Sequence, residues 1–166
     1  MNSLRTCADL EALGFQGFHT VADLIEDRSA IPEDPGVYAV LWTASEIPDF
    51  VEAGTGGWYN GRDPNVGRQT LSANWVPTSD VVYLGKAAGG VSGRRGLRKR
   101  LSEFLLFGQG RPTAHRGGRY ILQIRQSAEL VFCWMDVPDG CEAVESRLLA
   151  EFVAQHGRLP FANLRH

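Results

Sequence analysis

Cysteines are few in this chain, and a long apolar run is missing. Cys7, Cys133 and Cys141 are its three cysteines, and this odd, widely spaced set fits neither a disulfide framework nor a CxxC zinc site. Cys133 and Cys141 with His115 and His156 are the alternative metal set, but no closely spaced pair would anchor it. No run of ~18 apolar residues exists that would span a membrane, and acidic residues interrupt the N-terminus where a secretory signal needs apolar ones. We therefore expect reduced thiols, no membrane association and a cytoplasmic protein.

The sequence also lacks a net positive charge. Its formal charge is −2 at pH 7, which argues against nucleic-acid binding over the whole surface, because phosphate neutralisation needs concentrated lysine and arginine. Between residues 86 and 125, however, Glu103 is the only acidic residue. The basic residues of that stretch are Lys86, Arg94, Arg95, Arg98, Lys99, Arg100, Arg111, Arg116, Arg119 and Arg125. This distribution predicts a basic face that grips a phosphate backbone, with a solvated helix face as the alternative for Arg95, Arg98 and Lys99.

Length and periodicity predict one α+β domain over residues 1–166. Residues 1–33 are interpreted as an N-terminal helical extension, made of two short helices joined by a turn. Strands are expected at 36–42 and 80–86, and a helix at about 94–107. The segments RYILQIRQ and AELVFCWMDV are expected to form a hairpin joined near Ser127. The last expected element is a helix at about 139–156, with Asp139 as its N-cap. The expected architecture is a small mixed, mainly antiparallel sheet flanked by helices.

Residues 43–79, between the first two strands, are rich in Gly, Asn and Pro, yet they contain Trp58, Tyr59 and Trp75. A disordered linker rarely carries such side chains, so we expect an ordered insertion. Substrate contact through Trp58, Tyr59 and Arg62 is one interpretation of this segment. Packing of Trp58 and Tyr59 against the sheet is the alternative, and it is favoured at least equally.

Two strand tripeptides, an arginine-rich helix and a late glutamate form the most specific pattern in the chain. Gly36-Val37-Tyr38 opens the run GVYAVLW, and Tyr83-Leu84-Gly85 lies within VVYLGK. GLRKRLSEFL follows a glycine-rich turn, and EAVESRLLAEFVAQHGRLPFAN comes near the end. These four elements, in this order over residues 34–164, resemble the GIY-YIG nuclease superfamily. The resemblance implies a metal-dependent endonuclease that hydrolyses phosphodiester bonds in DNA.

The same resemblance implies roles for the two tyrosines and their neighbour. Tyr38 would act as general base or orient the attacking water, and Tyr83 would line the site beside it. A phenol loses its proton only at a pKa of about 10, so the role of base requires nearby positive charge. Lys86 and the metal would supply that charge. Without the surrounding motif, core packing would be the preferred interpretation of both tyrosines.

The resemblance also assigns the phosphate and metal contacts. Glu145 would bind Mg²⁺ or Mn²⁺, because such a hard ion accepts one protein carboxylate together with the substrate phosphate and waters. Glu142 is the rival within the sequence, although negative charge at a helix N-terminus accounts for it. Arg100 would grip the scissile phosphate through its planar fork. Asn163 would brace the site by hydrogen bonding.

One position departs from the family. Four residues after Arg100, where a histidine or tyrosine is common, stands Phe104, which cannot transfer a proton. His115 in the next loop is the candidate replacement, and a solvent-exposed loop histidine is the alternative. Further DNA contacts are expected from Arg94, Arg95, Lys99 and Arg119.

Two other functions remain open at this point. Phe104 and the modest net charge favour a catalytically weak or inactive nucleic-acid-binding module, and the segment around Trp58 would suit an interaction protein. A homodimer or an accessory protein is left open as a source of specificity, because no separate recognition domain is evident.

Overall fold

The computed structural model of the chain describes residues 2–90, 95–113, 115 and 117–164. Their elements, in order, are α1 (Cys7–Ala12), β1 (Gln16–Thr20), α2 (Val21–Glu26), β2 (Gly36–Leu41), α3 (Arg68–Asn74), β3 (Val81–Ala87), α4 (Leu97–Gly108), the 3₁₀ helices η1 (Arg119–Gln123) and η2 (Ser127–Glu129), β4 (Val131–Asp136) and α5 (Cys141–His156). The fold class is α+β, as expected from the sequence. No helix in these ranges combines the length and the apolar character needed to cross a membrane.

The sheet has the strand order β1-β4-β2-β3. The sheet was expected to be mixed and mainly antiparallel, and every pair of strands within the described residues is antiparallel. All six residues of β2 are buried, since this strand has a neighbour on each side and a helical layer on each face. β3 lies at one end of the sheet and β1 at the other.

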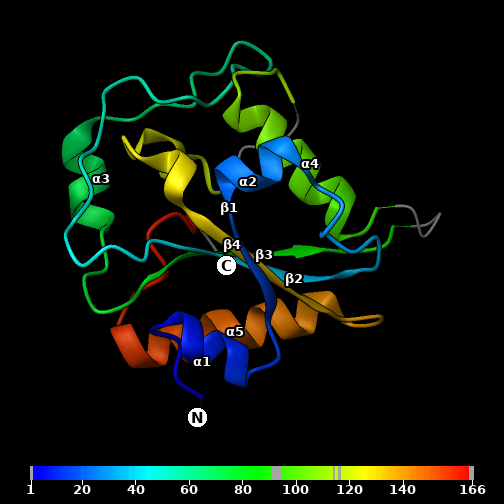
Figure 1. Ribbon diagram of the computed structural model, residues 1–166. Helices are drawn as coiled ribbons and strands as arrows, with labels where there is room; N and C mark the ends of the chain where they lie inside the picture. Colours follow the sequence, from blue (N-terminus) through cyan, green and yellow to red (C-terminus); the bar gives the residue numbers. More distant parts are fainter. Residues whose placement is uncertain (1, 91–94, 114, 116, 165–166) are drawn as a thin grey trace.

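Alternation along β2 builds two separate cores. Tyr38 and Val40 belong to a cluster shared with α2 and α4, whereas Val37 and Ala39 belong to a cluster shared with α1 and α5. Successive strand residues point to opposite faces, so a strand that is apolar throughout must be covered on both. Figure 1 shows the result, with α1 and α5 on one side of the sheet and α2 and α4 on the other.

The N-terminal segment differs from the expected pair of helices joined by a turn. Two short helices do form, and Thr6 and Thr20 cap them through hydrogen bonds from the backbone N–H groups of Asp9 and Asp23. Between them, however, lies the strand β1, which pairs with β4. The first 33 residues therefore supply one edge of the sheet.

Two further expectations about local structure are wrong. RYILQ forms the 3₁₀ helix η1 and not the first strand of a hairpin, so only β4 pairs with β2 from this region. A short, fully buried apolar run looks the same in a strand and in a buried helical turn. Helix α5 begins after Gly140, whose positive φ of 79° places it in the left-handed region, and Asp139 is not its N-cap.

The segment 43–79 is held by hydrogen bonds to the rest of the chain. The buried side chain of Gln123 donates to the carbonyl oxygens of Val51 and Val66. Two tryptophans of this segment differ in their surroundings. Trp58, whose packing against the sheet was one of the two interpretations, is 57% exposed. Trp75 is buried and packs against Phe161 with ring centroids 5.2 Å apart.

Candidate functional site

The site begins with the register of β2 and β3. Tyr38 lies directly opposite Gly85, and a Cβ atom at Gly85 would come within 2.6 Å of Cζ of Tyr38. Only glycine leaves room for the phenol ring across the strand pair. The ring of Tyr38 therefore reaches that of Tyr83, with centroids 5.9 Å apart. The two strand tripeptides thus place their tyrosines side by side on the α4 face.

A cleft of about 340 Å³ opens beside these two rings. It is lined by Tyr38, Tyr83, Lys86, Ala87, Ala88, Gly90, Arg95, Lys99, Arg100 and Glu145. β2 and β3 form its floor, α4 supplies cations from one face of the sheet, and α5 supplies the carboxylate from the other. Seven of the side chains singled out in the sequence therefore meet in one place.

Lys86 lies between two carboxylates of α5. Its Nζ is 3.0 Å from Oε2 of Glu145 and 3.4 Å from Oε1 of Glu142. The hydrogen bond with Glu145 is the main cause that raises the pKa of Lys86, so the ammonium group stays charged. Of the two carboxylates, only Glu145 lines the cleft, and its side chain is 18% exposed against 83% for Glu142.

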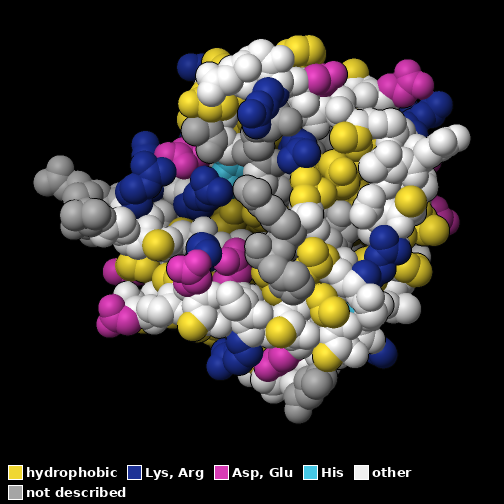
Figure 2. All heavy atoms as spheres, turned by 180° about the vertical axis from the view of Figure 1, so that it is seen from behind, with side chains coloured by type: hydrophobic (Ala, Val, Ile, Leu, Met, Phe, Trp, Pro, Cys, Tyr) yellow, Lys and Arg dark blue, Asp and Glu magenta, His cyan; other side chains and the backbone are white. Residues whose placement is uncertain are grey.

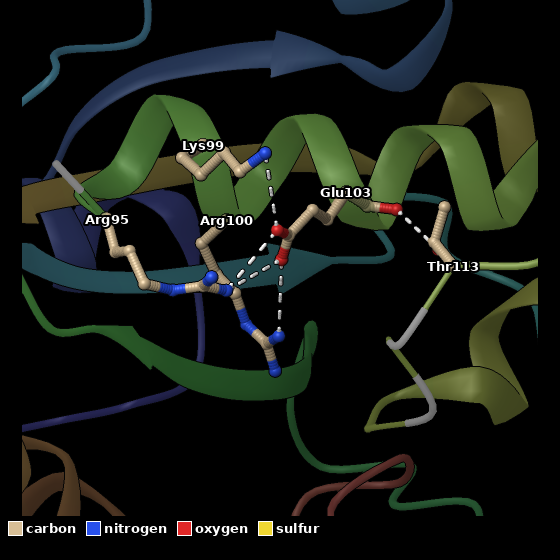
Figure 3. Close-up of polar contacts among 5 residues, drawn as sticks. All are labelled: Arg95, Lys99, Arg100, Glu103 and Thr113. Atoms are coloured by element: carbon tan, nitrogen blue, oxygen red, sulfur yellow. Dashed lines mark hydrogen bonds and ion pairs between the residues drawn. The ribbon is translucent and has the colours of Figure 1, made fainter. Parts of the chain in front are cut away.

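The cations on the α4 side converge on Glu103, as Figure 3 shows. Its carboxylate oxygens lie 3.3 Å from Arg95, 3.7 Å from Lys99 and 3.8 Å from Arg100. Its backbone carbonyl also accepts a hydrogen bond from Thr113. In the sequence, Glu103 stands out only as the single acidic residue between residues 86 and 125. The spacing of three and four residues from Arg100 and Lys99 was the available signal for these ion pairs.

Burial sets the state of the two phenols. The pKa of Tyr38 is raised well above its usual value, first by burial and then by the neighbouring Tyr83, while Arg100 acts in the opposite direction. Burial also raises the pKa of Tyr83. The hydroxyl of Tyr38 has no hydrogen bond of normal geometry with a described residue, although Tyr83 and Arg100 are near it. Both side chains are therefore neutral phenols at physiological pH.

A second hollow, of about 560 Å³, adjoins the first. Its lining consists of Arg62, Tyr83, Lys86, Gly117, Gly118, Arg119, Glu145, Leu149, Ala162, Asn163 and Leu164. Tyr83, Lys86 and Glu145 belong to both hollows and separate them. Figure 2 shows one face of the molecule on which Lys and Arg side chains gather beside a group of Asp and Glu side chains.

Asn163 closes the free edge of β3. Its Oδ1 accepts a hydrogen bond from the backbone N–H of Leu84 at 2.9 Å, and its Nδ2 donates to the carbonyl of the same residue at 2.8 Å. The backbone N–H of Ala162 also donates to Val82. The side-chain amide thus replaces a missing neighbouring strand, which is the bracing expected of this residue.

Phe104 and His115 lie behind the cleft. Phe104 is buried with its ring centroid 6.2 Å from that of Tyr83 and 4.3 Å from that of His115. His115 is fully buried, so the alternative of an exposed loop histidine is wrong. It is not among the described residues that line either hollow. Burial, followed by the charge of Arg100, lowers its pKa to about 3.

Glu145 supplies the carboxylate of the cleft that a metal ion could use. No group of three or more His, Cys, Asp or Glu side chains within the described ranges is arranged to hold an ion. Glu145 nevertheless presents hard oxygen donors to the cleft, and among the described residues only its Oε2 is engaged in an ion pair. A Mg²⁺ or Mn²⁺ ion that takes one carboxylate, substrate oxygens and waters fits this arrangement.

Of the remaining residues that the sequence predicted for the site, those that the structure describes do not line the first cleft. Arg119 and Asn163 lie at the second hollow rather than the first. Arg94 lies outside the described residues, as does Arg116. The contact between Gly85 and the Tyr38 ring could not be predicted from the sequence, because it depends on the strand register. Comparisons of the chain with protein-family models, with curated proteins and with solved structures found no match.

Proposed function

We propose that this protein is a divalent-metal-dependent endonuclease of GIY-YIG type that hydrolyses phosphodiester bonds in DNA. The observation that carries the proposal is the convergence of Tyr38, Tyr83, Lys86, Arg100 and Glu145 on one cleft. These residues come from four separate elements, β2, β3, α4 and α5, and the sequence resemblance selected them independently of their position. Three free cysteines suit the reducing cytoplasm that we propose as its location.

Arg100 is the proposed contact to the scissile phosphate. Its side chain lines the cleft and is 30% exposed, so the guanidinium group is accessible to an anionic ligand. A planar fork with several N–H donors can bind two phosphoryl oxygens at once. Arg95 and Lys99, at the same cleft, extend the positive charge towards the neighbouring backbone of the DNA.

Tyr38 has two candidate roles, and the raised pKa of its phenol favours one of them. A neutral phenol can hold a water molecule in line with the phosphorus but is a poor proton acceptor. Hydrolysis adds this water across one P–O bond, so that the water oxygen bonds to phosphorus and the departing sugar oxygen takes up a proton. We assign to Tyr38, with Tyr83 beside it, the orientation of the water.

Glu145 is the residue that would hold the metal. A bound Mg²⁺ or Mn²⁺ would supply positive charge to the phosphoryl and leaving oxygens. Lys86 holds the carboxylate of Glu145 in place through the 3.0 Å ion pair and remains charged. Its ammonium group therefore adds a fixed positive charge at the centre of the site.

A nucleic-acid-binding module without strong catalysis is the second candidate. Phe104 favours it, because a buried phenyl ring beside Tyr83 occupies the position where the family commonly has a group able to transfer a proton. In this alternative the basic cleft would still bind DNA. Cleavage, and not binding, is therefore the measurement that separates the two candidates.

The test is nicking of supercoiled plasmid DNA in Mg²⁺ by the parent protein, by Glu145→Gln and by Glu142→Gln. Glu145→Gln should reduce nicking by about 100-fold or more, since a catalytic metal supplies several kcal/mol of transition-state stabilisation. Glu142→Gln is the matched control. It removes the other carboxylate that pairs with Lys86, from the same helix, without changing a residue of the cleft.

Equal nicking by the parent and Glu145→Gln would rule out the proposed enzyme. If none of the three proteins nicks the plasmid while the parent retains DNA in a gel-shift assay, the binding module is the correct function.

A further inference from the structure

The second hollow is lined by two arginines, Arg62 and Arg119, to which the proposed reaction gives no role. We propose that it is a subsite for the phosphate next to the scissile one on the same DNA strand, with Arg62 and Arg119 as its phosphate-binding residues. This inference rests on the proposed function and extends it, since it gives the insertion between β2 and β3 a direct part in substrate binding.

A tight turn places Arg62. Tyr59 and Arg62 form an isolated antiparallel bridge, and the backbone N–H of Arg62 donates to the carbonyl of Tyr59 at 3.1 Å. Asn60 and Gly61 between them both have positive φ, 52° and 71°. This is the pattern of a type I′ turn, which favours asparagine followed by glycine. The sequence YNGR thus fixes the backbone from which Arg62 extends.

The turn belongs to a segment that is tied to the site's own elements. The backbone N–H of Gly57 donates to Phe107 of α4 at 2.9 Å, and that of Thr55 donates to Leu122 of η1 at 3.1 Å. Asn65 accepts a hydrogen bond from the backbone of Gly54 across the loop. The guanidinium group of Arg62 is therefore carried by an anchored backbone, which lowers the entropy cost of ordering it on a ligand.

Arg119 reaches the same hollow from a different segment. It is the first residue of η1, and its Cζ lies 5.6 Å from the centre of the Tyr120 ring. Stacking on an aromatic ring restrains a guanidinium group. Glu145 is the only carboxylate among the described residues that line the hollow, and Lys86 already compensates its charge.

The two hollows share a wall. Tyr83, Lys86 and Glu145 line both, with Arg100 on one side and Arg62 on the other. A strand whose scissile phosphate lies over this shared wall has the second hollow directly beside it. The volume of about 560 Å³ lies in the range of about 300 to 1,000 Å³ that is usual for small-ligand sites. It therefore offers space for a flanking nucleotide with its phosphate at the two arginines.

Salt dependence of DNA binding tests this proposal directly. Each phosphate contact with single-stranded DNA contributes about 0.7 to the slope of log K against log salt. Binding of a fluorescent single-stranded oligonucleotide is measured by anisotropy in EDTA over a range of salt. Arg62→Ala should lower the slope by about 0.7 and weaken binding about three- to tenfold at low salt.

Arg68→Ala is the matched control. Arg68 lies in the same insertion and is exposed, but it pairs with Glu52 at 3.6 Å and lines neither hollow. Its removal should leave the slope unchanged. The proposal is wrong if Arg62→Ala has the slope of the parent, or if Arg68→Ala lowers it equally. If thermal unfolding shows that Arg62→Ala does not fold, Arg62→Gln, which keeps a long polar side chain, takes its place with the same expected slope.

The assay needs neither metal nor cleavage, so its result is separate from that of the nicking test. Glu145-dependent nicking with an unchanged slope for Arg62→Ala would refute the subsite and leave the endonuclease standing. A lowered slope without nicking would refute the endonuclease and leave a phosphate site on a binding module. Absence of oligonucleotide binding by the parent would refute the subsite, and the nicking test alone would then decide the endonuclease.

Discussion

At the scale of the residue, burial decides what His115 can do. Its ring is fully enclosed and packs edge to face against Phe104, and no described residue forms a hydrogen bond of normal geometry with its ring nitrogens. The charge of Arg100 adds to the effect of burial, so the pKa of this histidine falls to about 3. A neutral, enclosed imidazole packs here as an aromatic side chain.

This pKa makes folding stability depend on pH. Between pH 7 and pH 4.5 the unfolded chain binds a proton at its histidine, whose ordinary pKa is 6.5, while folded His115 stays neutral. Stability therefore decreases as the pH falls through this range. Replacing His115 with Phe should reduce that loss by about 2–3 kcal/mol. Urea unfolding of both proteins at the two pH values measures the difference. An identical loss in parent and variant would mean that the folded protein protonates this ring readily.

At the scale of the element, α4 carries two cations of the cleft, Lys99 and Arg100, together with Glu103, the carboxylate that pairs with them. A phosphate entering the cleft must compete with Glu103 for Arg95, Lys99 and Arg100. Glu103→Gln should therefore bind DNA more tightly, by about two- to fivefold, because partly exposed ion pairs contribute about 0.5–1 kcal/mol. Fluorescence anisotropy in EDTA provides the affinity.

Glu33→Gln is the control for this change. It removes a carboxylate paired at 2.9 Å with Arg98, which also lies on α4 but lines neither hollow. Its DNA affinity should stay that of the parent. Tighter binding by both variants would assign the effect to net charge, and weaker binding by Glu103→Gln would mean that the carboxylate mainly positions the arginines.

The elements also show where sequence reasoning succeeds. β2, β3 and α5 have long apolar patterns whose period follows from the backbone, and the sequence predicted each of them to within a few residues. β1 has no such pattern. Its residues are exposed or partly buried, and Phe18 within it has a positive φ of 56°. Only pairing with β4 makes this segment a strand, and that pairing joins positions far apart in the chain.

The features of the candidate site also fall into two groups, those that a local sequence pattern predicts and those that depend on how the chain folds. Tyr38, Arg100 and Glu145 were identified because short motifs carry them. The ion pairs of Lys86 with the two α5 carboxylates, and the enclosure of His115, depend on how helices pack against the sheet. Such contacts join residues that no local pattern relates, so they became visible only in the folded chain.

At the scale of the whole molecule, the N-terminal segment is part of the structure that holds the site. Leu10 of α1 is fully buried in the same cluster as Leu148 and Leu149 of α5, the helix that carries Glu145. Figure 1 shows α1 and α5 together on one side of the sheet. The position of Glu145 therefore depends on residues that precede the first tyrosine strand.

This dependence predicts that the chain unfolds as a unit. Leu10→Ala should lower the free energy of unfolding by about 2–5 kcal/mol, because it leaves a cavity in a closed core. Leu13→Ala, at the partly buried end of the same helix, should cost about 1 kcal/mol, since its side chain retains contact with water. Tryptophan fluorescence and far-ultraviolet circular dichroism in urea should give coincident transitions for both variants. Nicking should disappear at the urea concentration of that transition. A Leu10→Ala protein that loses helical signal early but keeps Glu145-dependent nicking would show that the N-terminal segment unfolds independently of the site.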